Sequence, residues 1–263
     1  MEGSLLKGRR GVIMGVANDH SIAWGIARLA ASHGAELAFS YQNEAFRRRV
    51  DPLAASVGSS TLIECDVSDP RAVEKMFDQI GQEWNEIDFV VHAVAYSDKA
   101  ELSGRYVDTT LSNFQQTLAI SCYSFTAVAR SVEKLMTKGG SLVTMTYLGA
   151  ERVMPNYNVM GVAKAALEAS VRYLAADLGP NGIRVNGVSA GPMRTLAGSA
   201  IADARQVYRF NEQHSPLRRN VSLDEVGGTA LYFLSDLSSG VTGEVHHVDS
   251  GFHVIGMPKP SQD

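Results

Sequence analysis

The sequence is poor in cysteine. Only Cys65 and Cys122 occur among its 263 residues, and they are far apart. Small secreted domains that are stapled by disulfides carry far more cysteine, so we expect a reducing compartment. The first residues, MEGSLLKGRRG, lack the apolar core of a signal peptide, and no apolar run is long enough to span a bilayer. We therefore expect a cytoplasmic protein without a membrane partner.

A long basic block is absent as well. The chain has 24 Lys and Arg against 28 Asp and Glu, which gives a formal net charge of −4. The densest basic run, Arg47 to Arg49, is typical of a solvated helix face, so we expect no nucleic-acid partner. No HxxxH or CxxC pattern occurs, and the adjacent His246 and His247 would point to opposite faces of a strand. We therefore expect no metal site.

Short apolar runs alternate with helical patterns along the whole chain. This alternation predicts an α/β protein whose seven parallel strands are covered by helices on both faces. Because no linker interrupts the pattern, we expect one Rossmann-like, doubly wound domain over residues 1–256, followed by a flexible tail at 257–263. The strands are expected at 11–16, 36–42, 61–67, 87–95, 140–147, 183–190 and 244–250, and the helices at 21–34, 43–57, 69–84, 112–137, 157–178 and 223–235.

Local signals refine two of these helices. Pro52 is expected to kink or break the helix at 43–57, because proline removes one hydrogen bond and clashes with the preceding turn. Asp69 and Pro70 are expected to begin the next helix as its cap and first residue.

The turn after the first strand, GVANDHSIAWG, lies where a doubly wound sheet binds its ligand. It does not match GxGxxG. One interpretation is that Gly15 lets the backbone approach a dinucleotide, while Ser21, Ile22 and the first-turn amides receive its pyrophosphate. The alternative is a polar loop in which Ser21 caps the helix.

The ends of the second and third strands carry candidate nucleotide contacts. Gln42 stands near the position where many NAD-binding domains have an acidic residue that binds the adenosine ribose. Arg47 is helical and several residues further on, which leaves open whether it reaches a 2′-phosphate, and we favour NADH over NADPH. Asp66 is expected to accept a hydrogen bond from the adenine amino group, and its alternative role is to cap a helix.

Tyr157 and Lys164 are seven residues apart in the sequence YNVMGVAK. Seven residues make nearly two turns, so both side chains would share one face of a helix. Tyr147 ends the fifth strand, which would bring two phenols and one ammonium group close together at the ligand crevice. The alternative is an accidental pair, with the tyrosine half-buried and the lysine solvated.

Several segments resemble the NADH-dependent enoyl-acyl carrier protein reductases of bacterial fatty-acid synthesis, a divergent branch of the short-chain dehydrogenase/reductases. The resemblance covers about residues 4 to 256. It rests on GVANDHSIAWGIA, AELAFSYQNE, CDV, GEVHHVDSGF and, most specifically, the block from TYLGAERVMPNYNVMGVAK to VSAGPMRTLAG. Ordinary members of the larger family carry Tyr-x-x-x-Lys, which would place tyrosine where this chain has Met160.

The resemblance implies a reaction and a role for each residue of the pair. Hydride would reach C3 of an enoyl thioester, and negative charge would develop on the thioester oxygen two carbons further away. Our hypothesis is that the wide spacing moves Tyr157 outward to bind that oxygen. Lys164 would hold the nicotinamide ribose. Tyr147 would shape the acyl pocket, either with a direct catalytic part or as a packing residue, and Met160 would line the pocket or fill the core.

The resemblance also implies further contacts and partners. An acyl carrier protein bearing an enoyl thioester would be the substrate, and the chain would form a homotetramer. The additional cofactor contacts would be Val67, Val94, Met193, Thr195, Leu196 and Ala197, and the additional substrate contacts would be Ser97 and Ile201.

The segment 194–215 is expected to form a small helical lid over the substrate, and its alternative is an ordinary surface helix. Arg205 and Arg209 would share a helix face and could meet an acidic carrier protein or simply be solvated. Where many family members read SIGF, this chain has AVAY at 93–96. The rival functions are a carbonyl reductase of the same fold and a non-catalytic dinucleotide sensor.

Overall fold

Seven parallel strands form one sheet in the order β3-β2-β1-β4-β5-β6-β7 in the computed structural model, which describes residues 4–199 and 202–257. The predicted seven-stranded doubly wound sheet is therefore confirmed. Between β3 and β4 the chain crosses to the other side of β1, which creates the switch point where such sheets bind ligands. The strands are β1 (Arg10–Met14), β2 (Glu36–Tyr41), β3 (Thr61–Glu64), β4 (Phe89–His92), β5 (Gly140–Thr146), β6 (Ile183–Ala190) and β7 (Val245–Val248).

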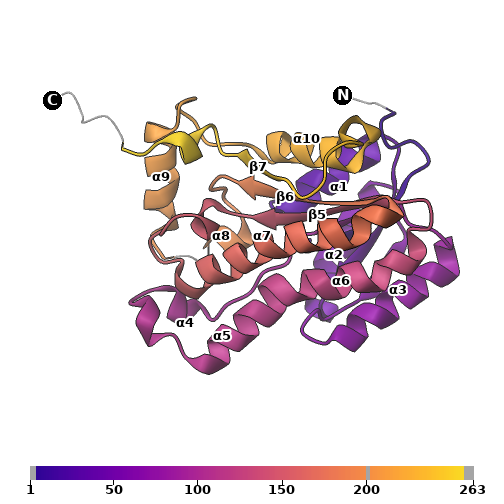
Figure 1. The fold of residues 1–263 in the computed structure, drawn as a ribbon, viewed down its shortest axis with the longest axis horizontal. Coiled ribbons are helices and arrows are strands. Elements are labelled where there is room, and N and C mark those ends of the chain that lie inside the picture. The colour runs from indigo at the N-terminus through magenta and orange to yellow at the C-terminus, as the bar shows by residue number, and fades with distance from the viewer. Residues whose placement is uncertain (1–3, 200–201, 258–263) are drawn as a thin grey trace.

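Helices cover both faces of the sheet (Figure 1). One face packs against an apolar core that includes Ile26, Val50 and Phe233, and the other against a core that includes Phe77 and Phe125. The first face carries α1 (Ile22–Ser32), α2 (Glu44–Ser56) and α10 (Leu223–Leu234), and the second carries α3 (Pro70–Trp84), α6 (Ser124–Val132) and α7 (Asn158–Leu178).

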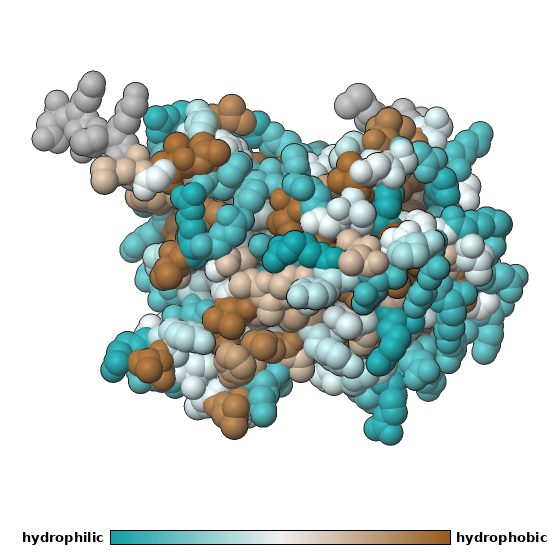
Figure 2. Space-filling model, viewed as in Figure 1, coloured by the Kyte–Doolittle hydropathy of each residue, from teal (hydrophilic) through white to brown (hydrophobic). Residues whose placement is uncertain are grey.

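Four other helices gather at one end of the molecule. These are α4 (Lys99–Leu102), α5 (Leu111–Leu118), α8 (Leu196–Ser199) and α9 (Ala204–His214). Figure 1 shows α4, α8 and α9 at the left end of the view, and Figure 2 shows several apolar side chains exposed on that side. These elements follow the carboxyl ends of β4 and β6, so they surround the edge of the sheet where a ligand is expected.

The strand and helix predictions hold with small changes at the ends. Asp69 caps α3 by accepting a hydrogen bond from the Arg71 amide, and Pro70 is its first residue, as predicted. The prediction that Pro52 could break its helix is wrong, because α2 continues through it to Ser56. The carbonyl that loses its partner belongs to the exposed Arg48, where water can replace the missing amide.

The long helix expected at 112–137 is two helices joined by a π-helical turn, η2 (Ala119–Tyr123). Small polar side chains account for the interruption. The Ser124 hydroxyl donates to the Ile120 carbonyl at 2.6 Å, and the Ser121 hydroxyl bonds both the amide and the carbonyl of Tyr96. Such bonds compete with the regular helical pattern and bend it.

The predicted lid contains α8 and α9, while residues 200 and 201 lie outside the described part of the chain, as do residues 258–263 of the predicted tail. Among the described helices, none combines the length and the apolar character needed to cross a membrane.

Gly15 closes β1 in a conformation that only glycine adopts easily. Its φ is +98°, and a Cβ at this position would stand 2.1 Å from the carbonyl oxygen of Ala93. The end of β1 therefore approaches the backbone after β4 more closely than a side chain permits.

Gly15→Ala is expected to lower the free energy of unfolding by more than about 3 kcal/mol, because it combines a strained φ with a clash against backbone. Gly58→Ala is the matched control: its φ is +77°, but no atom lies within 4 Å of the added Cβ. It should cost about 1 kcal/mol. Urea unfolding measures the free energy of unfolding of both variants. Equal losses would contradict the close approach of Gly15 to the Ala93 carbonyl.

Candidate active site

Tyr157 and Lys164 are both buried at the start of α7. Tyr157 is the residue immediately before the helix, and Lys164 lies two turns further on. Their exposed fractions are 8% and 6%. The Lys164 ammonium donates a hydrogen bond of 2.8 Å to the Met145 carbonyl of β5, which ties it to the end of that strand. The alternative of a solvated lysine is therefore wrong.

The two predicted tyrosines are in contact. The rings of Tyr147 and Tyr157 pack edge to face, with 5.1 Å between centroids and 73° between planes. Met160 lies beside them in a separate apolar cluster, which consists of Leu102, Tyr157, Met160 and Ala163 with Leu118, Tyr147 and Met154 packed against it. Leu102 could not be recognised from the sequence, because the stretch that contains α4 is polar overall.

The turn η4 (Leu148–Ala150) lies directly beneath the catalytic candidate Tyr157. A Cβ on Gly149 would be 2.4 Å from the Tyr157 ring, and a Cβ on Gly161 would be 2.8 Å from the Gly149 carbonyl oxygen. The absence of side chains at both glycines lets the turn, the ring and α7 pack together. The backbone of η4 therefore fixes the position of the phenol.

Burial shapes the ionisation of all three polar groups. It raises the pKa of Tyr147 to about 12, and it raises the pKa of Tyr157 further, with smaller contributions from Tyr147 and Glu168. Both phenols therefore remain hydrogen-bond donors at neutral pH. Burial lowers the pKa of Lys164 to about 8, against the smaller opposing effects of Cys122 and Glu168. Lys164 is thus mostly charged at pH 7 without being solvated.

His92 is a buried group near this lysine that sequence reasoning missed. Its ring nitrogens hydrogen-bond the hydroxyls of Thr144 at 3.1 Å and Ser124 at 2.8 Å. Burial, together with the positive charge of Lys164, lowers its pKa to about 3, so the imidazole is neutral. It joins β4, β5 and α6 beneath the site without adding charge.

The loop after β1 forms the candidate pyrophosphate site. The Ser21 hydroxyl accepts hydrogen bonds from the amides of Ala17 and Asn18 at 3.0 and 3.1 Å, and it does not cap α1. The alternative that Ser21 caps the helix through its side chain is therefore wrong. The hydroxyl instead folds the loop. The Trp24 amide already bonds the Ser21 carbonyl at 3.0 Å, so the candidate anion site consists of the amides before it, beginning at Ile22.

Gln42 and Asp66 meet at the ends of β2 and β3. The Gln42 amide donates to the Asp66 carboxylate at 3.3 Å, and the Ser68 amide donates to it at 2.9 Å. Although partial burial opposes it, hydrogen bonding from Ser68 and Gln42 holds the pKa of Asp66 below its ordinary value. Asp69 caps α3, so the alternative role of Asp66 as the helix cap is wrong; its neighbour Val67 is buried.

The segment after β4 is held by α5 and η2. Val94 is half-buried against the core beneath α3 and α6. The Ser97 hydroxyl accepts a hydrogen bond from Thr117 at 2.8 Å and donates to Asn113 at 3.3 Å. Ser97 is therefore already paired with α5, which orients the loop at the rim of the apolar cluster.

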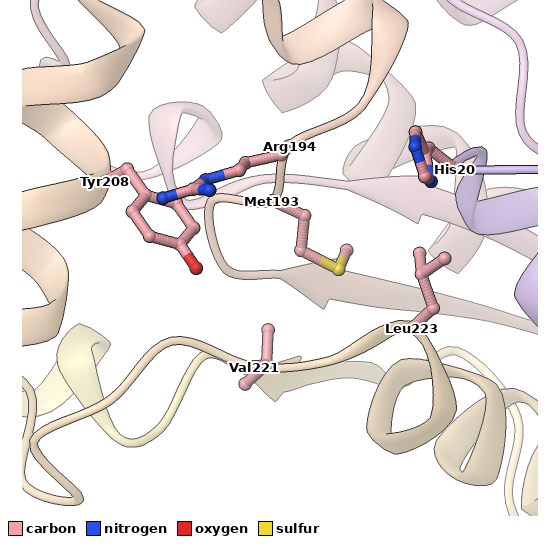
Figure 3. Close-up of a pocket in the computed structure, with 6 residues that line it drawn as sticks. All are labelled: His20, Met193, Arg194, Tyr208, Val221 and Leu223. Carbon is pink, nitrogen blue, oxygen red and sulfur yellow. The ribbon is translucent and has the colours of Figure 1, made fainter.

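A cavity of about 200 Å³ opens beside the loop after β6, lined by His20, Met193, Arg194, Tyr208, Val221 and Leu223 (Figure 3). The Arg194 guanidinium lies 4.8 Å from the centre of the Tyr208 ring, and Met193 extends toward Val221 and Leu223. Of the residues that line this cavity, only Met193 was a predicted contact. Arg194 is its neighbour in the chain and Tyr208 lies in the predicted lid, whereas His20, Val221 and Leu223 come from segments that the sequence pattern does not connect.

The remaining predicted contacts lie around α8. The Thr195 hydroxyl accepts a hydrogen bond from the Gly198 amide at 2.9 Å. Leu196 and Ala197 belong to α8, and Ile201 lies outside the described residues. The cavity and the tyrosine pair are separate in this structure, since neither Tyr157 nor Lys164 lines the cavity.

A family model described as Enoyl-(Acyl carrier protein) reductase matches residues 15–253. The chain belongs to this family. Among the enoyl-acyl carrier protein reductases, the chain is 60% identical to the Rhizobium meliloti protein named enoyl-[acyl-carrier-protein] reductase [NADH] 2, over 97% of this chain and 95% of that one.

Solved enoyl-acyl carrier protein reductases have the same fold. The crystal structure of the enzyme from Anaplasma phagocytophilum in complex with NAD superposes with a TM-score of 0.95, at 59% identity and 98% coverage of both chains. The Bacillus cereus enzyme, in complex with NADP+ and indole naphthyridinone, gives a TM-score of 0.95 at 49% identity, over 96% of this chain and 99% of that one. The family resemblance of the sequence is thus confirmed.

Lys164→Met is expected to stabilise the protein at pH 7 by up to about 3 kcal/mol, because burial makes the charged form costly by about that amount. Loss of the hydrogen bond to Met145 offsets part of this gain. The native lysine releases its proton near pH 8 and the unfolded lysine near pH 10.5. The free energy of unfolding of the wild type should therefore rise across that range, and the advantage of Lys164→Met should shrink.

Urea unfolding of both proteins at pH 7 and pH 10 measures this difference. Two results would contradict the prediction. One is a lower free energy of unfolding for Lys164→Met than for the wild type at pH 7, and the other is a difference between the two proteins that increases with pH.

Proposed function

We propose that the protein uses NADH to reduce the trans-2 double bond of enoyl thioesters carried by acyl carrier protein, the last step of the fatty-acid elongation cycle. One observation carries this proposal. A phenol and an ammonium group stand two turns apart, both buried at the start of α7, with Met160 between them beside an apolar cluster. A carbonyl reductase of the same fold would need tyrosine at that intermediate position. The name of the Rhizobium meliloti relative supports the same reaction.

The described residues fit a dinucleotide. Gly15 brings backbone close to the ligand edge, and the uncapped amides after Ser21 suit a pyrophosphate. Gln42 and Asp66 present a neutral amide and a carboxylate, which favour the ribose hydroxyls and adenine of NADH over a 2′-phosphate. When bound, NADH supplies the hydride. The other proposed cofactor contacts are Ile22, Val67, Val94, Lys164, Met193, Thr195, Leu196 and Ala197.

Tyr157 donates a hydrogen bond to the thioester oxygen as negative charge develops there. Its raised pKa keeps the proton on the phenol, and its apolar surroundings strengthen the bond. Lys164 binds the nicotinamide ribose, and its charge makes the local potential positive, which favours the enolate. Tyr147 fixes the Tyr157 ring by edge-to-face packing. These two phenols and the lysine are the proposed catalytic residues.

The apolar cluster around Met160 receives the acyl chain, and Ser97, Tyr147, Met160 and Ile201 are the proposed substrate contacts. Because Tyr157 is almost fully covered, the substrate must displace covering side chains to reach it. The segment 194–215 is proposed as the lid that moves, and the contact of Arg194 with Tyr208 joins the start of this segment to α9.

Exposed residues suggest where partners bind. Arg205 and Arg209 are both exposed and four apart on α9, which suits docking of an acidic carrier protein. Apolar side chains are exposed on η2 and α7, including Tyr123 and Tyr173, and they support assembly into a homotetramer. We propose that the protein docks an acidic carrier protein at α9, that it forms a homotetramer, and that it acts in the cytoplasm.

The reaction is tested by following NADH absorbance with a crotonyl or longer enoyl thioester, and separately with a ketoacyl thioester of equal length. We expect oxidation of NADH with the enoyl substrate and a far slower rate with the keto substrate. Oxidation with the keto substrate alone would replace the proposal with a carbonyl reductase.

Tyr157→Phe is expected to lower kcat about 100-fold, the usual cost of losing one donor to a developing oxyanion, while the Kd for NADH stays near the wild-type value. Tyr232→Phe, at an exposed position on α10, is the matched control and should leave kcat unchanged. Steady-state kinetics and NADH fluorescence titration measure the two quantities. Unchanged turnover in Tyr157→Phe would refute the assigned role.

A further inference from the structure

Four side chains beside η4 form a ladder of contacts: Glu151, His247, His253 and Asp249. A ring nitrogen of His247 lies 2.7 Å from the Glu151 carboxylate, and a ring nitrogen of His253 lies 2.9 Å from the Asp249 carboxylate. The two imidazoles stack on each other, with 4.2 Å between centroids and 19° between planes. Each ring therefore has a carboxylate at its outer end, and the four groups make one continuous chain of contacts.

One end of the ladder is anchored in the C-terminal turn η7 (Phe252–Val254). Asp249 is buried, and its carboxylate also accepts hydrogen bonds from the amides of Gly251 at 2.9 Å and His253 at 2.8 Å. Three hydrogen bonds to one buried carboxylate hold the turn and the His253 ring in a single orientation.

The other end of the ladder holds η4. Glu151 follows that turn directly, and its neighbour Arg152 donates to the Ile255 carbonyl at 3.0 Å, which forms a second tie to the C-terminal segment. The turn begins after Tyr147, and its Gly149 packs under the Tyr157 ring. A shift of η4 would therefore move both phenols.

The contacts of the ladder are more sheltered than an ordinary surface ion pair. The His247 side chain is 19% exposed and the Asp249 side chain 6%, whereas Glu151 is 42% exposed. Glu168 of α7 interacts electrostatically with His247 and Glu151. Arg172 of the same helix interacts electrostatically with Glu168. Phe252 of η7 packs against Phe210 of α9, so the turn also touches the proposed lid.

We propose that Glu151, His247, His253 and Asp249 are positioning residues that hold η4, and through it Tyr147 and Tyr157, in the geometry for enoyl reduction. This role rests on the proposed function. It accounts for the stacking of two imidazoles between two carboxylates beside η4. The ladder acts on turnover through the orientation of the phenols.

His253→Ala tests the proposal, because it removes both the stacked ring and the hydrogen bond to Asp249. We expect kcat to fall about 10-fold, since small displacements of reacting groups are costly, with the KM for NADH and the Tm near wild-type values. His253→Asn keeps a donor in the place of the ring nitrogen that faces Asp249, and it should recover most of the lost kcat.

Glu151→Ala is the second variant. It breaks the opposite end of the ladder at a partly exposed residue whose loss does not threaten folding, and it should lower kcat in the same way. The matched control is His246→Ala, because His246 precedes His247 on β7 but its ring packs toward Phe233 instead. It should leave kcat unchanged.

Unchanged kcat in both His253→Ala and Glu151→Ala would overturn the proposal. So would a loss of kcat that follows the Tm in every variant, without recovery in His253→Asn, because the ladder would then be only structural. Failure of the proposed function is a separate outcome, in which the wild-type protein itself does not oxidise NADH with an enoyl thioester.

Discussion

The hydrogen bond from the Lys164 ammonium to the Met145 carbonyl is the interaction on which the site depends. It places a positive charge inside the protein at the end of β5, and the lowered pKa of the lysine shows that this charge is kept at a cost. The charge has no carboxylate partner within hydrogen-bonding distance among the described residues, so its field remains available to a ligand. An ordinary buried ion pair would cancel that field.

The surroundings of Lys164 preserve the field. Burial and the nearby positive charge keep His92 neutral, and the hydroxyls of Thr144 and Ser124 satisfy its ring without adding charge. Burial keeps both tyrosines protonated. The site therefore combines one cation with two neutral donors, an arrangement that favours an anion formed during a reaction over one already present in the substrate.

The sequence predicted the elements that depend on local patterns. Short strand-like runs, most of them apolar, marked the seven strands, and Asp69 with Pro70 marked the start of α3. The two-turn spacing of Tyr157 and Lys164 pointed to the candidate site before its geometry was known. These signals succeed because strand burial, helix caps and helix periodicity are set by neighbouring residues.

Other features depend on contacts between distant segments, and the sequence could not reveal them. The contact of Arg194 with Tyr208 and the ladder from Glu151 to Asp249 join residues that no periodicity relates. The predicted break at Pro52 did not occur, at a turn where the carbonyl without an amide partner belongs to the exposed Arg48. Ser21 was assigned two roles from its position, and only the coordinates show that its hydroxyl turns back to Ala17 and Asn18.

The π-helical turn η2 separates two tasks within what would otherwise be one helix. Before it, Leu118 of α5 packs against the apolar cluster around Met160. After it, Phe125 of α6 fills the core beneath the sheet. The additional residue in a π turn rotates everything beyond it by about 100° relative to a regular helix. The apolar cluster and the packing of the sheet can therefore tolerate substitutions independently, because the helix before η2 and the helix after it present their side chains in different directions.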